Sequence, residues 1–376
     1  MTPPQSRKRQ LDAVSASDSL LAKRARLTQT DGRIGSLRSS ARLQALRHPA
    51  SSRDPTRLVS PAPPCELQTE TGARSVPKRA RLTRKNLQLL NRMIKSKLTT
   101  ETHSTTSSGF EAQALKNGIL DRVKSKAPAN LNDRRTRLNR KRETASPTES
   151  MYGDYVAAVT TAPNEQTMIY EMAKLLKEHN DRGYRKVLNQ AFTAFPKEVG
   201  FNNGLSAPQP DLVEGLQLRR FLPFPVDEQL DGAALIKDDP YSITLPHLAG
   251  EWKGPGKDMN EARMQSAYDG AALVYERNQA LEFLGEPDPP DHAAVSSFTT
   301  DGTTLNFFCH HSAPSKDRDK IEYHQCLMTF TNLMNSFDGF EQGRKQLRNL
   351  QEDARDESYA LRDRLQGHWK ARQGAI

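Results

Sequence analysis

A stretch with the pattern of a buried strand, followed by a tight turn and then a long helix, constrains the fold of this chain most. Residues 245–253 (LPHLAGEWK) are apolar over most of their length, and Gly254-Pro-Gly256 comes directly after them. Residues 260–284 then carry apolar side chains at the spacing of a helix. We expect a strand that ends at the turn and a helix that begins just after it.

Two charged residues stand at the end of that strand, in the only acid-x-Lys triplet of the chain, Glu251-Trp252-Lys253. Side chains alternate along a strand, so Glu251 and Lys253 share one face and stand roughly 6.6 Å apart along it. The other side chains expected on that face are Leu245, His247 and Ala249. A carboxylate beside an ammonium, with a second carboxylate from a neighbouring strand, suits a divalent metal ion and phosphodiester hydrolysis. About one such triplet is expected by chance in a chain of this length, so its context carries the argument.

Charge is divided unevenly along the 376 residues. Residues 1–150 hold 31 Lys and Arg against 12 Asp and Glu, a net charge of +19. Residues 151–376 hold 24 against 33, a net charge of −9. Hydrophobic residues make up only 35% of the chain, which is low for a globular protein of this size. We therefore expect a disordered basic N-terminal region followed by an acidic folded part.

Short basic clusters mark the N-terminal region. The sequence KRARLT occurs twice, at residues 23–28 and 78–83, and a further basic run covers residues 134–142. Such clusters are typical of nuclear import signals or of tethers to nucleic acid, although basic runs in tails also occur for solubility alone. The residues predicted to take part are Lys23, Arg24, Arg26, Lys78, Arg79, Arg81, Arg140, Lys141 and Arg142. We expect a nuclear location and a nuclear import receptor as a partner.

Cysteine usage and hydropathy agree with a location inside the cell. Cys65, Cys309 and Cys326 are too few for a disulfide framework, and they show no paired CxxC spacing for zinc. Free thiols fit a reducing compartment. No apolar run approaches the roughly 18 residues that a membrane-spanning helix needs. We expect no membrane partner, and the sequence leaves the oligomeric state open.

Helical periods occur in the first half of the chain. Residues 84–98 and 110–120 are predicted helices, and Asn117-Gly118 is expected to stop the second one. Asn164 is expected to cap a helix over residues 165–180, and residues 184–195 are expected to continue with more helix.

Strand signals follow. Prolines punctuate residues 197–250, which we expect to form strands and loops. Asp301-Gly302 is a strong hairpin signal between strands expected at residues 292–300 and 303–311. Residues 322–337 and 341–370 are expected to be helices. The order of helix, strands, helix, strands and helices indicates an α/β or α+β fold in which helices flank a mixed sheet.

These signals divide the chain into four parts. Residues 1–105 are the expected disordered basic tail, and residues 106–150 are a partly ordered basic linker with a short helix. Residues 151–345 form the expected folded domain, and residues 346–376 form a charged C-terminal helix.

Several motifs occur together between residues 110 and 350: PDLVEG (210–215), AGEWK (249–253), Gln265 and Asp269-Gly-Ala271 on the following helix, the Asp301-Gly302 hairpin, and His310-His311. Together they resemble a group of functionally uncharacterised fungal proteins described as PD-(D/E)xK nuclease-like. That resemblance implies the restriction-endonuclease-like fold, whose core is helix, three strands, helix, strand. It also implies a metal-dependent nuclease that uses Mg²⁺ or Mn²⁺ and acts on nucleic acid, with DNA the expected form.

The resemblance implies roles for individual residues. Asp211 and Glu251 would bind the metal ion, and the backbone carbonyl of Trp252 would supply another ligand. Lys253 would position or help deprotonate the attacking water and offset the charge that develops on the phosphorane.

Gln265 and one further acid complete the implied site. Gln265 would face it from the following helix, and either Glu165 or Glu171 would add an acid from the first helix.

Three features depart from the superfamily's pattern. The long gap between Asp211 and Glu251 predicts an insertion that loops out across residues 217–242. Tyr268 follows Gln265 after two residues, whereas some members carry Gln-x-x-x-Tyr. The folded part is net negative, which is unfavourable for binding a polyanion unless the basic tail supplies the affinity.

Structural alternatives exist for each signal. Glu251 and Lys253 also fit an ordinary salt pair, and Asp211 also fits a turn cap after Pro210. Trp252 lies on the opposite strand face, where core packing is expected. Adjacent histidines at 310 and 311 point to opposite faces, so a zinc site is not expected there.

The competing functional class is a catalytically inactive binding module that keeps the fold. It would use the basic tail to bind chromatin or a protein partner. A third class is an effector or self-defence protein that works inside a larger assembly.

Overall fold

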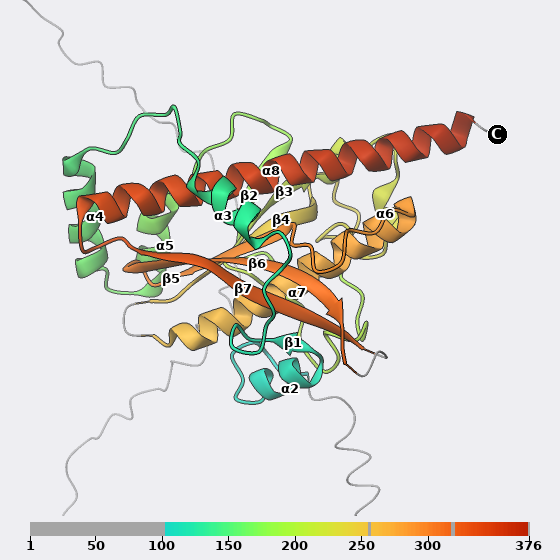
Figure 1. Cartoon of the computed structure of the whole chain (residues 1–376), viewed down its shortest axis with the longest axis horizontal. Helices are drawn as coiled ribbons and strands as arrows, with labels where there is room; N and C mark the ends of the chain where they lie inside the picture. The colour runs from blue at the N-terminus through green and yellow to red at the C-terminus, as the bar shows by residue number, and fades with distance from the viewer. Residues whose placement is uncertain (1–101, 255–256, 317–319, 375–376) are drawn as a thin grey trace, which may run out of the picture. The chain divides into compact units, whose positions relative to one another are not determined.

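A seven-stranded mixed sheet with the strand order β1-β7-β6-β5-β4-β3-β2 forms the centre of the molecule (Figure 1). The computed structural model describes residues 102–254, 257–316 and 320–374, which all belong to one unit, Ala80–Ile376. Its strands are β1 (Ile119–Leu120), β2 (Tyr184–Leu188), β3 (Leu212–Gln217), β4 (Ile243–Trp252), β5 (Val295–Thr300), β6 (Thr304–Pro314) and β7 (Ile321–Asn332). Neighbouring strands are antiparallel except β4 with β5 and β1 with β7. The expected α/β architecture with a mixed sheet flanked by helices is confirmed.

Helices cover both faces of the sheet. They are α2 (Phe110–Lys116), α3 (Leu131–Asn139), α4 (Glu149–Thr161), α5 (Glu165–Ala173), the short η2 (Leu218–Arg220) and α6 (Val226–Gln229), α7 (Met259–Leu284) and α8 (Phe337–Gly374). Figure 1 shows α8 running along one face, with α7 on the opposite one. The core clusters place α3, α4 and α5 with α8, and α2 with α7.

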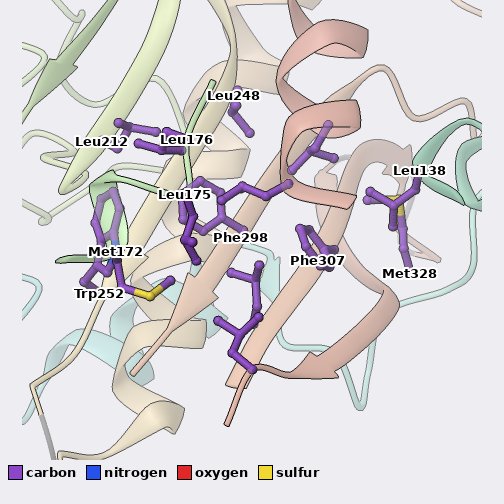
Figure 2. Packing of buried hydrophobic residues seen from close by; sticks show 14 of the residues in the cluster. Leu138, Met172, Leu175, Leu176, Leu212, Leu248, Trp252, Phe298, Phe307 and Met328 are labelled. Atoms are coloured by element: carbon purple, nitrogen blue, oxygen red, sulfur yellow. The ribbon is translucent and has the colours of Figure 1, made fainter. Parts of the chain in front are cut away.

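The core on the α8 face collects every second residue of the central strands. Leu248 and Trp252 of β4 and Phe298 of β5 are fully buried there. Figure 2 shows Met172, Leu175 and Leu176 lying close to Trp252 and Leu212. The alternate residues of the same strands, among them Val213 and Ala249, are buried on the α7 face. Each fully buried large side chain stabilises the fold by about 1.5–3 kcal/mol, so the two clusters hold the sheet between its helices.

Capping residues fix both ends of α7. Asp258 is the N-cap and its carboxylate accepts a hydrogen bond from the Asn260 amide at 2.8 Å. Gly285 ends the helix in the left-handed conformation, with φ of 68°, where a residue without Cβ is favoured. The expected helix over residues 260–284 is confirmed, as is the hairpin at Asp301-Gly302 between β5 and β6.

One helix prediction is wrong, and another holds only in part: α5 begins at Glu165 with Asn164 as its N-cap, as expected. Residues 184–195 do not continue the preceding helix; Tyr184–Leu188 instead form β2, which pairs with β3 along its whole length and buries Tyr184. The helix predicted over residues 165–180 ends early, at Ala173. At Tyr184–Leu188, pairing with β3 overrides the local period.

Residues 322–337 were also expected to be helical, but Ile321–Asn332 form β7. Phe307 pairs with Thr329 and Phe308 with Leu327, so Met328 is an extra residue in the strand. Such a bulge shifts the two-residue alternation and leaves apolar side chains at a spacing that imitates a helix. The last helix, expected over residues 341–370, is confirmed as α8.

The expected part boundaries differ from the organisation of the described residues. Residues 106–150 include α2, stopped at Asn117 as expected, and also β1 and α3, which belong to the same sheet and core. The expected boundary at residue 345 lies inside α8. The predicted helix at 84–98, the two KRARLT copies and Cys65 lie outside the described residues.

Candidate active site at the end of strands β3 and β4

Asp211 and Glu251 come together at one end of the sheet. Leu212 of β3 pairs with Gly250 of β4, and the Trp252 amide donates a 2.8 Å hydrogen bond to Oδ2 of Asp211. Val213 and Ala249 pack toward α7. Because side chains alternate along a strand, Asp211 and Glu251 take that same face. Both side chains are buried.

Lys253 continues the same face just beyond β4. Its backbone amide donates to the Thr300 carbonyl at 2.9 Å, which fixes the end of the strand against β5. Its Nζ donates to Oε1 of Gln265 at 2.6 Å and lies 3.3 Å from Oε1 of Glu261. The lysine side chain is only 4% exposed. A buried ammonium is costly unless it is paired, so these two contacts explain how the fold tolerates it.

Helix α7 supplies the polar groups opposite the strand end. Gln265 donates from Nε2 to Oε1 of Glu261 at 3.3 Å and to the Thr105 carbonyl at 3.4 Å. Among Lys253, Gln265 and Glu261, the glutamate is the residue nearest to solvent, and its side chain is 43% exposed. Asp269 is buried one helical turn beyond Gln265. Gln265 was expected at the site, but Glu261 was not, although its position four residues before Gln265 on a helix would have indicated it.

Of the two candidate acids on α5, Glu165 and Glu171, only Glu165 lies next to the end of β4. Glu165 begins α5, and a Cβ placed on Gly254 would stand 3.2 Å from the Cβ of Glu165 and 3.3 Å from its backbone nitrogen. Gly254 therefore allows the start of α5 to approach the end of β4. Glu171 instead pairs with Lys174 at 2.5 Å on its own helix.

Trp252 behaves as expected for its face. Its ring packs edge to face on Phe298, with centroids 5.4 Å apart, in the core of the α8 face. The shared face expected for residues 245–253 holds only in part. Leu245 has φ of 46° and joins a separate core cluster, and His247 binds Ser358 of α8. The register shift between Glu214 and Leu216 breaks the alternation there.

The donor set fits a hydrated magnesium ion better than a closed metal centre. Among the residues that the structure describes, no group of three or more His, Cys, Asp or Glu side chains is arranged to hold a metal ion. Magnesium is often bound by one or two carboxylates, with water and substrate phosphate as the other ligands. Asp211 and Glu251 supply a carboxylate pair of that kind.

The predicted insertion does not lie at this end of the sheet. Residues 217–242 carry η2 and α6, and Phe221, Phe224 and Leu230 pack with Leu245 and with the last turns of α7. Leu281 follows Gln265 by sixteen residues, which is roughly 24 Å along a helix. The insertion therefore packs at the far end of β4, away from Lys253.

A short segment before α2 borders the site instead. His103 forms a bridge with Leu205, and its carbonyl accepts from the Ser206 amide at 3.0 Å. Tyr268 of α7 donates from its hydroxyl to the Ser206 carbonyl at 2.6 Å. These contacts hold residues 103–105 beside Gln265.

The basic run at residues 134–142 is attached to α8. Arg140 and Arg142 bind Glu352 at 2.9 and 2.6 Å, whereas Lys141 is exposed. Burial alone would raise the pKa of Glu352, but hydrogen bonds from Arg142 and Lys177 lower it to about 2. An import receptor that reads this run would have to compete with α8 for the two arginines.

The adjacent histidines of β6, His310 and His311, point apart, as expected. His310 lies on the α7 face, where its Nε2 is 2.7 Å from Oγ of Ser297, and burial lowers its pKa to about 3. His311 stacks on His324 with ring centroids 4.8 Å apart.

Comparison with protein-family models, with curated proteins and with solved structures returned no match. Within the described ranges, none of the helices has both the length and the apolar character required to cross a bilayer.

Proposed function

We propose that this chain is a metal-dependent nuclease of the PD-(D/E)xK type that hydrolyses phosphodiester bonds of nucleic acid, with DNA the expected form. The observation that carries the proposal is the meeting of Asp211, Glu251 and Lys253 on one face at the end of β3 and β4, with Gln265 bound to the lysine. Apart from the short η2 and α6 between β3 and β4, the order α5, β2, β3, β4, α7, β5 agrees with a core of helix, three strands, helix, strand.

The proposed roles follow from the geometry. Asp211 and Glu251 would hold Mg²⁺ or Mn²⁺, with the Trp252 carbonyl as a further ligand; such an ion acts as a Lewis acid and lowers the pKa of bound water. Lys253 orients the attacking water and offsets charge on the phosphorane. Gln265 fixes the direction of the ammonium. Glu165 supports the site from the start of α5.

One observation favours the alternative, a binding module that keeps the fold without cleaving. Asp211, Glu251, Lys253 and Gln265 are all buried, and the lysine is already engaged by α7. Cleavage requires residues 103–105 to move away from Gln265 so that a phosphate can approach. If they do not move, the chain would bind chromatin or a protein partner through other surfaces.

Cleavage assays separate the two functions. The purified chain is incubated with labelled single- and double-stranded DNA and RNA, with Mg²⁺ or Mn²⁺ and with EDTA. We expect metal-dependent cutting that is lost in Asp211→Ala and Lys253→Ala. Asp227→Ala and Lys237→Ala are matched controls, because both side chains are exposed in the insertion at the other end of β4. A folded wild type that cuts nothing and binds no metal by calorimetry supports the binding module.

We propose that the protein works in the nucleus and is carried there by an import receptor. The support is the pair of KRARLT sequences. A fluorescent fusion should lose its nuclear signal when Lys23, Arg24, Arg26, Lys78, Arg79 and Arg81 are changed to Ala together. Unchanged nuclear accumulation of that variant would reject these clusters as the signal.

A further inference from the structure

Two of the three cysteines face each other across adjacent strands. Cys309 of β6 pairs directly with Cys326 of β7, and the pairs on either side, Phe308 with Leu327 and His310 with Gln325, are in continuous register. Directly opposed residues of antiparallel strands have Cα atoms roughly 4.5–5.5 Å apart. That distance lies within the range of about 4.4–6.8 Å that a disulfide spans. The backbone is therefore already placed for a bond between the two sulfurs.

The two thiols differ in access. Cys309 is fully buried in the core of the α8 face, and its Sγ lies 3.7 Å from the carbonyl oxygen of Cys326. Cys326 packs at the border of the same core and is partly exposed. A small oxidant can thus reach Cys326, whereas Cys309 is enclosed by the core.

The surroundings of the pair favour Cys326, the more accessible cysteine, as the nucleophile. Interaction with the Cys309 thiol lowers the pKa of Cys326; burial opposes this effect, and the charge of the nearby Arg135 adds to it. The same interaction and burial raise the pKa of Cys309. Arg135 is held in place by its own hydrogen bond, from Nε to the Met328 carbonyl at 2.9 Å. The thiolate is the reactive form of cysteine, so Cys326 attacks and Cys309 resolves.

We propose that Cys309 and Cys326 form a reversible disulfide when the protein meets a hydroperoxide. The Cys326 thiolate attacks one peroxide oxygen, the O–O bond breaks, and hydroxide leaves, so that Cys326 becomes a sulfenic acid. The Cys309 thiol then gives up its proton, its sulfur attacks the Cys326 sulfur, and water leaves as the S–S bond forms. The two thiols lose two electrons to the peroxide, and a dithiol reductant returns them.

Intact mass and peptide mapping test the proposal in the full chain carrying Cys65→Ser, which leaves only the paired thiols. After stoichiometric hydrogen peroxide, we expect the mass to fall by two hydrogen atoms, neither cysteine to be alkylated, and the two cysteine peptides to be linked. Dithiothreitol should restore both thiols. Two free thiols after treatment, a link between two molecules, or a Cys326 that proceeds to sulfinic acid would each overturn it.

Two variants test the assigned roles. In Cys309→Ala, whose folding is checked by circular dichroism, we expect a sulfenic acid at Cys326 that dimedone traps. Arg135→Gln should slow the reaction at pH 7, because a smaller fraction of Cys326 is ionised. An unchanged rate in Arg135→Gln, or no trapped sulfenic acid in Cys309→Ala, contradicts the assigned order of attack.

Discussion

Buried charged side chains have different partners on the two faces of the sheet. On the α8 face, Arg134 binds Asp353 at 2.7 Å, and the two side chains are 2% and 9% exposed. On the α7 face, buried Lys253 is held by a neutral amide and by a carboxylate that is 43% exposed. The first arrangement locks two opposite charges together within the protein. The second pairs a buried cation with a neutral amide and with a carboxylate that is partly exposed to solvent.

Breaking the buried pair on the α8 face should have the largest effect. Arg134→Met leaves the Asp353 carboxylate without its main partner inside the core, and we expect the free energy of unfolding to fall by about 3–5 kcal/mol. Urea unfolding monitored by circular dichroism measures it. The double variant Arg134→Met with Asp353→Leu should recover much of the loss. A single variant as stable as the wild type would contradict the contrast between the faces.

Removing the amide that holds Lys253 should affect catalysis more than stability. Gln265→Ala deletes one buried hydrogen bond to the ammonium, worth about 1–1.5 kcal/mol, so we expect a roughly tenfold lower single-turnover cleavage rate. Substrate Kd should change little. Gln279→Ala on the same helix, partly exposed, is the control. A slower rate in the control, or an unchanged rate in Gln265→Ala, would rule out the positioning role.

Acid should weaken the α8 face through Glu352. Its folded pKa of about 2 lies below the unfolded value, so its stabilising contribution is complete above pH ~4.5 and is lost as the pH falls through 2. Because Glu352 is partly exposed, we expect only about 1 kcal/mol from it. Unfolding free energies of the wild type and Glu352→Gln, measured from pH 6 to pH 2, should converge at the acid end. Parallel curves would show that another group titrates.

The smallest effect is expected at Glu171. Its pair with Lys174 lies on the helix surface, where such contacts contribute about 0.2–0.5 kcal/mol. Glu171→Ala should therefore leave both the melting temperature and the cleavage rate close to those of the wild type. Glu165→Ala, at the contact with Gly254, should lower the cleavage rate in the same assay. Equal losses in the two variants would remove the distinction between these acids.

The sequence predicted most of the site, in part because some of its signals are local. Glu251 and Lys253 are two residues apart on one strand, so alternation was enough to place them on one face. Gln265 and Asp211 came from the resemblance to PD-(D/E)xK nuclease-like proteins and not from a periodic pattern. Thr105 and Glu165 reach the site from distant parts of the chain. No local pattern indicated which of the two acids on α5, Glu165 or Glu171, would lie next to the end of β4.

The errors in the fold have the same origin. Ile321–Asn332 and Tyr184–Leu188 become strands because partner strands elsewhere in the chain pair with them. A bulge at Met328 also hides the alternation that would have indicated β7. The spacing of apolar residues predicts an element well when that spacing alone fixes its structure, as in α7. It predicts an element poorly when pairing with a strand from a distant part of the chain fixes its structure.

The attachment of the early basic run to α8 has a consequence for the newly made chain. Arg142 and its partner Glu352 are 210 residues apart in sequence. At a synthesis rate of about 5–20 residues per second, roughly 10–40 s pass between the appearance of the arginine and that of the glutamate. During that interval Arg140 and Arg142 are without the acidic helix that later binds them.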